Sequence, residues 1–360
     1  MSIPLSVGGG AHFTHASRVT APGELRRDVW KAFFMTHETV AVVIPVYNGA
    51  AVIERAIRSV LDQTVAVAEI IVVDDGSVDD TVAVVERLAD TNPNITLIRQ
   101  PQNGGVSKAR NTGFAHATAD WIAILDADDA YRPNRIEELL KCAGDKPVDL
   151  VFDNMILHDL DAGVDFRTMM PRSLPDTTFD QIEYWKNCHV GGAQYSILKV
   201  MIRRQFIQAT GLLYDADLNV GEDLIYYGEA MALGATALLT HRPYYVYSVR
   251  LGAVSGKRNK ESRTQVNFAK IAQHVDALLD RRSNDIPPEA RKQAIICRNS
   301  MLAMDRINSY REERDYDRIA AGFRLLTDPG ALRLLLRKRR RQKVVRQPPY
   351  TFARSGDSDT

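Results

Sequence analysis

The hydrophobic pattern of residues 40 to 150 alternates between two periods. Nearly continuous apolar runs are typical of strands buried on both faces of a parallel sheet. They occur in VAVVIPV (40–46), EIIVVDD (69–75), ITLIRQ (95–100) and WIAIL (121–125). Segments with helical spacing follow each run: VIERAIRSVLDQ, TVAVVERLAD, GVSKARNTGFAHA and NRIEELLKC. This alternation predicts an α/β fold with a Rossmann-like, mostly parallel central sheet.

Changes in pattern further along suggest how the chain is divided. Residues 1 to 36 lack a continuous apolar segment, and no Pro/Gly/Ser linker interrupts the chain before about residue 256. Beyond that point the sequence becomes helical and charged. We expect a loose extension (1–36), one α/β domain (37–256), a helical, basic C-terminal region (257–347) and a disordered tail (348–360).

Composition and charge narrow the classes of partner. The 360 residues are 45% hydrophobic and 25% charged, which is ordinary for a globular protein. The net charge of +1 provides no overall field for nucleic acid. No apolar run reaches the 18 residues of a membrane-spanning helix. We therefore expect a soluble protein or one bound to a membrane surface, with no nucleic-acid partner.

Three carboxylates follow the apolar run WIAIL, at Asp126, Asp128 and Asp129. Two unit charges about 4 Å apart repel by roughly 4 kcal/mol at an effective dielectric near 20. Either water solvates this turn or a cation occupies it. Asp126 and Asp128 flank a single alanine at the predicted strand end, so both oxygens suit Mg²⁺ or Mn²⁺ shared with substrate phosphates. A phosphatase of the haloacid type is disfavoured, because its D-x-D lies near the start of its fold.

Polar residues also follow the other predicted strands, at the edge where open parallel sheets bind ligands. Pro45, Tyr47 and Asn48 end the first strand, and Asp75 ends the second, where it can accept hydrogen bonds from a nucleobase. In NGGVSKARNTG (103–113), Arg110 and Asn111 beside a glycine turn can reach a phosphate or ribose, or belong to a solvated helix face.

The order VIPVYN, VVDDGS, GGVSKARNTG, LDADD resembles the nucleotide-sugar half of the family 2 inverting glycosyltransferases, which have a GT-A fold. The resemblance extends over roughly residues 40 to 256. It implies that Asp75 holds the uracil base and that Asp126 and Asp128 contact the ribose and a metal-bound diphosphate. Asp128 would be the main metal ligand and Asp129 a supporting carboxylate. The nucleotide pocket would be lined by Pro45, Tyr47 and Asn48.

The resemblance also implies a catalytic base in an acidic pair that follows a glycine. NVGEDLIYYGEA supplies Asp223 as the base and Glu222 as its neighbour, although acids also favour the first turn of any helix. Such a base takes the acceptor hydroxyl proton, so Asp223 should fold close to Asp128. Downstream, Arg250 and Ser255 in YSVRLGAVSG are expected to contact phosphate.

The finer similarity is to bacterial exopolysaccharide transferases of the succinoglycan type. It implies transfer of glucose from UDP-glucose to an oligosaccharide on a polyprenyl diphosphate, at the inner face of the cytoplasmic membrane. The segment ALRLLLRKRRRQKVVRQ (331–347) has eight basic residues and no acid, which suits an anionic leaflet. A group of ring-bearing residues suits either an acceptor site or a buried structural role: His189, His241, Tyr244, Tyr245 and Tyr247.

Two other functions stay open. A nucleotidyltransferase would also bind a nucleotide, but VIPVYNGA lacks the basic, glycine-rich signature that typically lies near its first strand. A non-catalytic nucleotide-sugar binder is disfavoured by the presence of Asp126, Asp128 and Asp223 together.

Overall fold

The computed structural model describes residues 38–144, 146–172, 174–188, 195–249, 266–314 and 328–331. From Thr39 onward these residues form one compact unit. The strands are β1 (Val40–Val46), β2 (Glu69–Asp74), β3 (Ile95–Arg99), β4 (Trp121–Ile124), β5 (Ala130–Tyr131), β6 (Leu150–Asp159), β7 (Val164–Thr168), β8 (Thr177–Phe179), β9 (Val200–Arg203) and β10 (Ala237–Val249).

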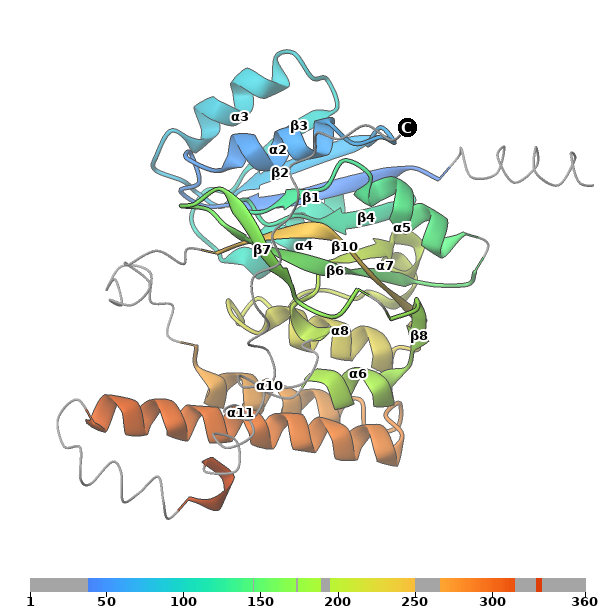
Figure 1. The fold of residues 1–360 in the computed structure, drawn as a ribbon, viewed down its shortest axis with the longest axis vertical. Coiled ribbons are helices and arrows are strands. Elements are labelled where there is room, and N and C mark those ends of the chain that lie inside the picture. Colours follow the sequence, from blue (N-terminus) through green and yellow to red (C-terminus); the bar gives the residue numbers. More distant parts are fainter. Residues whose placement is uncertain are drawn as a thin grey trace, which may run out of the picture. The chain divides into compact units, whose positions relative to one another are not determined.

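Helices connect most of these strands (Figure 1). They are α2 (Ile53–Leu61), α3 (Thr81–Ala89), α4 (Val106–His116), α5 (Arg135–Ala143), α6 (Gln181–Cys188), α7 (Arg204–Thr210), α8 (Glu222–Ala232), α10 (Phe268–Arg281) and α11 (Pro288–Arg314), with a short 3₁₀ turn, η1, at Tyr195–Ile197. The four strands and four helices expected between residues 40 and 142 all form, with ends that differ by a few residues.

The strands make one sheet in the order β3-β2-β1-β4-β9-β6-β10-β5, with β7 paired to β6 and β8 to β10. The pairs β1–β2, β1–β4, β2–β3 and β6–β10 are parallel. The predicted α/β class with a mostly parallel sheet is therefore confirmed. The short strands β5, β7 and β8 pair antiparallel at the margins of the sheet. Strand β9 lies inside the sheet and runs antiparallel to both β4 and β6. Its first residue consequently lies at the carboxyl end of β4, where the carboxylate cluster begins.

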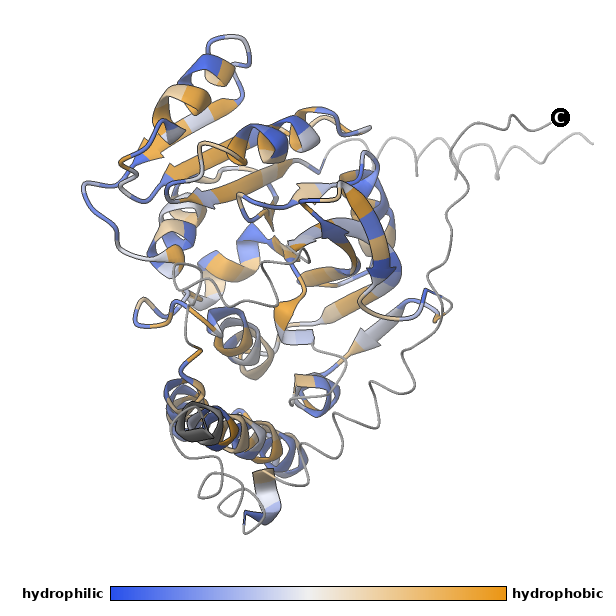
Figure 2. Ribbon diagram, turned by 60° about the vertical axis from the view of Figure 1, so that its left-hand side comes forward, coloured by the Kyte–Doolittle hydropathy of each residue, from blue (hydrophilic) through white to orange (hydrophobic). Residues whose placement is uncertain are grey.

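The core lies around the central strands. All seven residues of β1 are buried, as expected for a strand covered on both faces. On α2 the buried residues recur at helical spacing, at Ile53, Ala56, Ile57 and Val60. In Figure 2 the helices accordingly carry both orange and blue residues. Helix α4 approaches β1 so closely that a Cβ on Gly113 would lie 2.3 Å from Val43, which only glycine permits.

Helices α10 and α11 pack against each other and against α8 and α6, respectively (Figure 1). Their buried residues belong to the same hydrophobic core as the sheet: Ile271, Val275, Leu278, Ala290, Ala294 and Cys297. The predicted boundary between residues 256 and 257 falls outside the described residues, as do residues 1–36 and the tail from 348. Those divisions of the chain stay predictions.

Candidate active site

The carboxylate cluster follows β4 directly, and its three members differ in exposure. Asp128 is exposed, 24% of the Asp126 side chain is exposed, and Asp129 is buried. Asp129 accepts hydrogen bonds from the Tyr245 hydroxyl and the Ser248 amide, each at 2.7 Å. Asp129 thus fastens the end of β10 to the turn. Its role as a supporting carboxylate stays a prediction.

Arg110 on α4 is the first of two buried cations at this turn. Its guanidinium, 1% exposed, donates to Asp126 at 2.8 Å, to Glu222 at 2.8 Å and to Asp223 at 2.9 Å. Glu222 and Asp223 lie 112 and 113 positions from Arg110 along the chain, whereas Asp126 is 16 positions away, so α4 joins the end of β4 to the start of α8. Arg110 was expected to reach phosphate or ribose. In this conformation its ionic partners are instead the three carboxylates.

Lys199 is the second cation, and sequence reasoning missed it. Its ammonium lies 2.9 Å from Asp126 Oδ2 and 2.7 Å from Asp223 Oδ2. Burial alone would lower the pKa of Lys199, but the charges of Asp126 and Asp223 raise that pKa well above its ordinary value. The lysine is therefore charged. The sequence signal was a single basic residue inside the apolar run SILKVMI.

Asp223 lies in the first turn of α8, directly after Gly221, whose φ of 79° is the left-handed conformation that glycine adopts freely. Besides the two cations, the Tyr214 hydroxyl donates to Asp223 Oδ1 at 2.9 Å. Asp223 thus lies beside Asp126 although 96 positions separate them, as its predicted place near the D-x-D required. Tyr214, like Lys199, was not anticipated from the sequence.

The charges in this group perturb one another. Burial alone would raise the pKa of Asp126, but Lys199 and Arg110 hold it well below its usual range. The pKa of Asp128 is raised, first by partial burial and then by the negative charge of Asp126. Burial and the neighbouring carboxylates likewise raise the pKa of Asp129 well above its ordinary value. Two cations therefore stabilise Asp126, while Asp128 retains the repulsion that a bound cation would relieve.

At the neighbouring strand ends, Asp75 is buried and accepts hydrogen bonds from the Gly104 and Gly105 amides, both at 2.8 Å. These bonds orient a carboxylate at the carboxyl edge of β2. Tyr47 is 49% exposed, and Asn48 accepts from the Val78 amide with a φ of 48°. Pro45 is buried within β1, so it presents little surface to a ligand.

The contacts of Asn111 differ from those expected. Its side-chain amide donates to the Tyr214 carbonyl at 2.9 Å and accepts from the Tyr214 amide at 2.8 Å. Both polar atoms are occupied by backbone more than 100 residues away. In this conformation Asn111 therefore holds the loop that carries Tyr214, and contact with a phosphate or ribose would require those bonds to break.

Several predicted residues fall elsewhere. Arg250, Ser255 and His189 lie outside the described residues. Tyr245 and His241 are buried, and His241 hydrogen-bonds the Pro175 carbonyl at 3.0 Å. The buried structural alternative thus describes these two residues.

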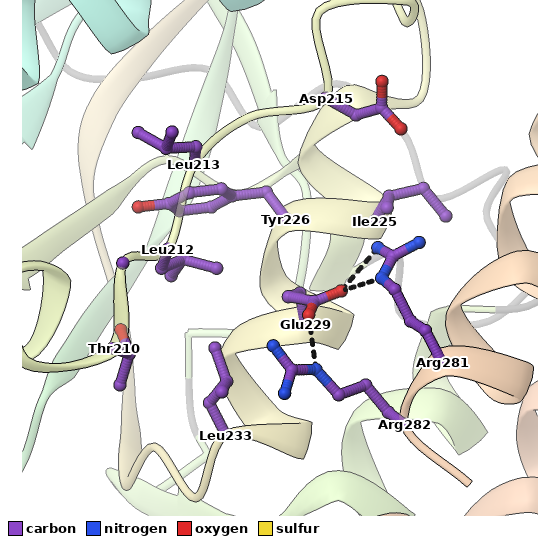
Figure 3. Close-up of a pocket in the computed structure, with 11 residues that line it drawn as sticks. Thr210, Leu212, Leu213, Asp215, Ile225, Tyr226, Glu229, Leu233, Arg281 and Arg282 are labelled. Carbon is purple, nitrogen blue, oxygen red and sulfur yellow. Dashed lines mark hydrogen bonds and ion pairs between the residues drawn. The ribbon is translucent and has the colours of Figure 1, made fainter.

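A pocket of about 260 Å³ lies on another side of α8 (Figure 3). Its charged lining includes Glu229, which receives Arg281 and Arg282 in ion pairs at 2.5 and 2.6 Å. Tyr226 and Leu212 form part of the apolar wall. Asp126 and Asp223 do not line it, so this pocket is separate from the carboxylate cluster.

The residues at the β4 end fit a divalent cation as a partial ligand set. Among the described residues, no group of three or more His, Cys, Asp or Glu side chains is arranged to hold an ion. Mg²⁺ is commonly bound through one or two carboxylates, with substrate phosphates and water completing its shell. Asp128 and Asp126 provide hard oxygen donors of that kind at the exposed edge of the cluster.

Part of the chain matches a known protein family. Residues 41–206 match the model of the family described as glycosyl transferase family 2. That segment, which is less than half of the chain, is similar to this family. The match ends before Asp223, so the acidic pair lies outside the matched segment, and the fold brings it to the end of β4.

The chain also resembles a bacterial protein of polysaccharide biosynthesis. The succinoglycan biosynthesis protein ExoO of Rhizobium meliloti (strain 1021) is 32% identical over 219 residues, covering 60% of this chain and 62% of ExoO. The chain thus spans slightly less than two thirds of that relative.

Two solved structures resemble the fold. S. aureus TarS 1-349 in complex with UDP-GlcNAc has 18% identity and a TM-score of 0.57, with 74% of this chain and 71% of TarS covered. The mannosyltransferase PcManGT of Pyrobaculum calidifontis, in complex with GDP-Man and Mn²⁺, has 18% identity and a TM-score of 0.50, with 88% and 92% covered. Both likenesses support a GT-A fold. Within the described part of the chain, no helix is both long and apolar enough to cross a membrane.

Proposed function

We propose that the protein is a metal-dependent, inverting hexosyltransferase that moves a sugar, glucose, from a UDP-sugar to a lipid-linked oligosaccharide in exopolysaccharide biosynthesis. The match to the family model supports glycosyl transfer, and the resemblance to ExoO supports the exopolysaccharide pathway.

One observation carries this proposal. Asp126, at the end of a parallel strand, and Asp223, at the start of α8, share the same two buried cations, Arg110 and Lys199. A donor-binding carboxylate and a base must lie this close, because the acceptor oxygen attacks the anomeric carbon next to the departing diphosphate.

The proposed chemistry assigns each group a task. Asp223 accepts the acceptor hydroxyl proton while the oxygen forms the new bond to the anomeric carbon and the bond to UDP breaks, with inversion. Among its described contacts, Asp223 Oδ1 accepts from Arg110 and Tyr214, whereas Oδ2 accepts from Lys199. Because a carboxylate oxygen can accept two hydrogen bonds, Oδ2 retains room for the incoming hydroxyl.

Donor recognition uses the carboxyl edge of the sheet. Asp75 would accept from the uracil N–H, and the segment with Pro45, Tyr47 and Asn48 would flank the nucleoside. Arg110 and Asn111 would support the donor through the groups they hold, and Arg250 would contact the phosphates. A Mg²⁺ or Mn²⁺ held by Asp128 and Asp126 would neutralise the diphosphate as it departs.

The decisive experiment is calorimetric titration of the full chain with UDP-glucose, UDP-galactose and UDP-N-acetylglucosamine, each with Mn²⁺ and with chelator. Metal-dependent binding of UDP-glucose is expected, and NMR of the transfer product should show the inverted anomeric configuration. Absence of binding by every UDP-sugar would contradict the proposed donor class. A retained configuration would contradict Asp223 as the base.

We further propose that the protein acts at the inner face of the cytoplasmic membrane, peripherally bound through its basic C-terminal segment. Truncation after Ala331, which is buried beside Met304 and Ile307, should abolish sedimentation with vesicles containing anionic lipid. UDP binding should persist. Unchanged sedimentation with anionic vesicles would contradict this membrane role.

A further inference from the structure

The side chain of Lys199 is only 6% exposed. A lysine is rarely buried to this extent unless it is paired with acidic groups, as Lys199 is. Its ammonium contacts the Oδ2 atoms of Asp126 and Asp223, at 2.9 and 2.7 Å. Arg110 contacts the Oδ1 atoms of the same two carboxylates. The two cations thus hold opposite oxygens, and together they restrict rotation of both carboxylates.

The fold fixes the lysine backbone from two sides. Extending the β4–β9 register by two pairs from Ala123–Met201 places Lys199 opposite Leu125, one residue before Asp126. The buried Arg135 donates to the Lys199 carbonyl at 3.0 Å, and the Tyr227 hydroxyl donates to the Leu198 carbonyl at 2.9 Å. The side chain therefore starts from a rigid point, which is the arrangement that positions a functional group reproducibly.

The charges around Lys199 are unbalanced. Arg110 and Lys199 directly contact three carboxylates, those of Asp126, Glu222 and Asp223. Without Lys199, a single guanidinium would face all three. The Oδ2 atoms of Asp126 and Asp223 would lose their shared donor, and mutual repulsion would favour their separation.

We infer that Lys199 is a positioning residue for sugar transfer, which sets the orientation of Asp223 toward the acceptor and competes with the divalent cation for Asp126. This inference rests on the proposed function, since it assigns a role within the same site. It predicts two opposite effects of one substitution. Loss of the ammonium should slow transfer, because the base is no longer oriented, and should strengthen metal binding, because Asp126 is freed.

The test is Lys199→Met in the full chain, which retains an apolar stem of similar length and removes the charge. Turnover should fall about 10- to 100-fold with little change in KM for the donor, as is typical when a supporting contact is lost. Calorimetric titration of Mn²⁺ into UDP-saturated protein should show binding tighter by about tenfold, because one competing unit charge is gone. Lys292→Met is the control: it removes an exposed lysine on α11 and should change neither value.

Thermal unfolding with Mn²⁺ and with chelator provides a readout independent of activity. Mn²⁺ should raise the melting temperature of Lys199→Met more than that of the wild type, because the ion replaces the lost charge. Weaker Mn²⁺ binding, or unchanged turnover, would overturn the inference. A variant unfolded both with and without Mn²⁺ would make Lys199 a purely structural residue and overturn it as well. Failure of the proposed function would appear in the wild type itself, as absence of UDP-sugar binding and transfer.

Discussion

Two buried arginines, Arg135 and Arg110, differ in the number of carboxylates that they contact. Arg135, at the start of α5, binds Asp153 on β6 at 2.8 Å, and both side chains are fully buried. Arg110 on α4 instead contacts Asp126, Glu222 and Asp223, of which Asp126 is partly exposed. Each arginine lies over a tyrosine ring, Arg135 over Tyr131 at 4.2 Å and Arg110 over Tyr214 at 5.0 Å.

The difference separates a structural ion pair from the proposed active site. The Arg135–Asp153 pair has one charge of each sign and is closed to water, so it has no capacity for a ligand. The Arg110 cluster has more carboxylates than cations and is open on the Asp126 and Asp128 side. Excess negative charge at an accessible edge favours a cation, which is the role that the proposed function gives to the metal ion. Substitutions in the two centres should therefore affect different quantities.

The largest effect is expected in the open cluster, from Asp223→Asn. The amide keeps the size of the side chain but cannot take the acceptor proton, so turnover should fall about 10²- to 10⁴-fold. Donor binding with Mn²⁺, followed by calorimetry, should persist. Asp217→Asn, an exposed change on the preceding loop, is the matched control. Normal turnover in Asp223→Asn would remove the base assignment.

In the closed pair, Arg135→Met should destabilise the protein by about 3–5 kcal/mol, because Asp153 is left as an uncompensated buried charge. Denaturant unfolding measures this change. The double variant Arg135→Met/Asp153→Leu should recover most of the stability, since an apolar pair replaces an ionic pair at little net cost. If Arg135→Met alone were as stable as the wild type, the Arg135–Asp153 pair would not stabilise the fold, and the contrast with the Arg110 cluster would fail.

The sequence predicted the first half of the fold well, because each element there has a local signal. Strand β1 is a continuous apolar run, and LDADD ends a strand with an evident charge problem. These patterns also placed Asp75 and Asp126 correctly at the edge of the sheet. Asp223 required the family resemblance, because GED alone equally describes an ordinary helix start.

Lys199 and the role of Asn111 could not be read in the same way. Lys199 reaches the cluster because β9 is antiparallel to β4, and strand direction is a property of long-range pairing rather than of the segment itself. Asn111 pairs with the backbone of Tyr214, a partner that the motif around Asn111 does not specify. Arg110 was predicted to be a functional residue, but the position of α8 determines two of its partners, Glu222 and Asp223.

A smaller effect is expected from Asp128→Asn, at the open edge of the cluster. The substitution removes the charge of the most exposed carboxylate, so Mn²⁺-dependent donor binding should weaken about 10- to 100-fold. Folding should be unaffected or slightly improved, because the repulsion from Asp126 that raises the Asp128 pKa disappears. Calorimetry with Mn²⁺ and with chelator gives the first value and denaturant unfolding the second. Equal donor affinity under all conditions would exclude Asp128 as a ligand.

The smallest expected effect distinguishes two tyrosines that stack with centroids 3.9 Å apart and planes 2° apart. The Tyr214 hydroxyl donates to Asp223, whereas the Tyr226 hydroxyl is buried without a hydrogen-bond partner among the described residues. Tyr214→Phe should cost about 1 kcal/mol of unfolding free energy, because Asp223 loses one donor and keeps Arg110 and Lys199. Tyr226→Phe preserves the same stack and removes an unpaired polar group, so its unfolding free energy should stay equal or rise. Equal losses in the two variants would show that packing of the hydroxyls, rather than the hydrogen bond to Asp223, determines the cost. The Arg110 cluster would then, like the Arg135–Asp153 pair, be stabilised mainly by contacts among its own charged groups.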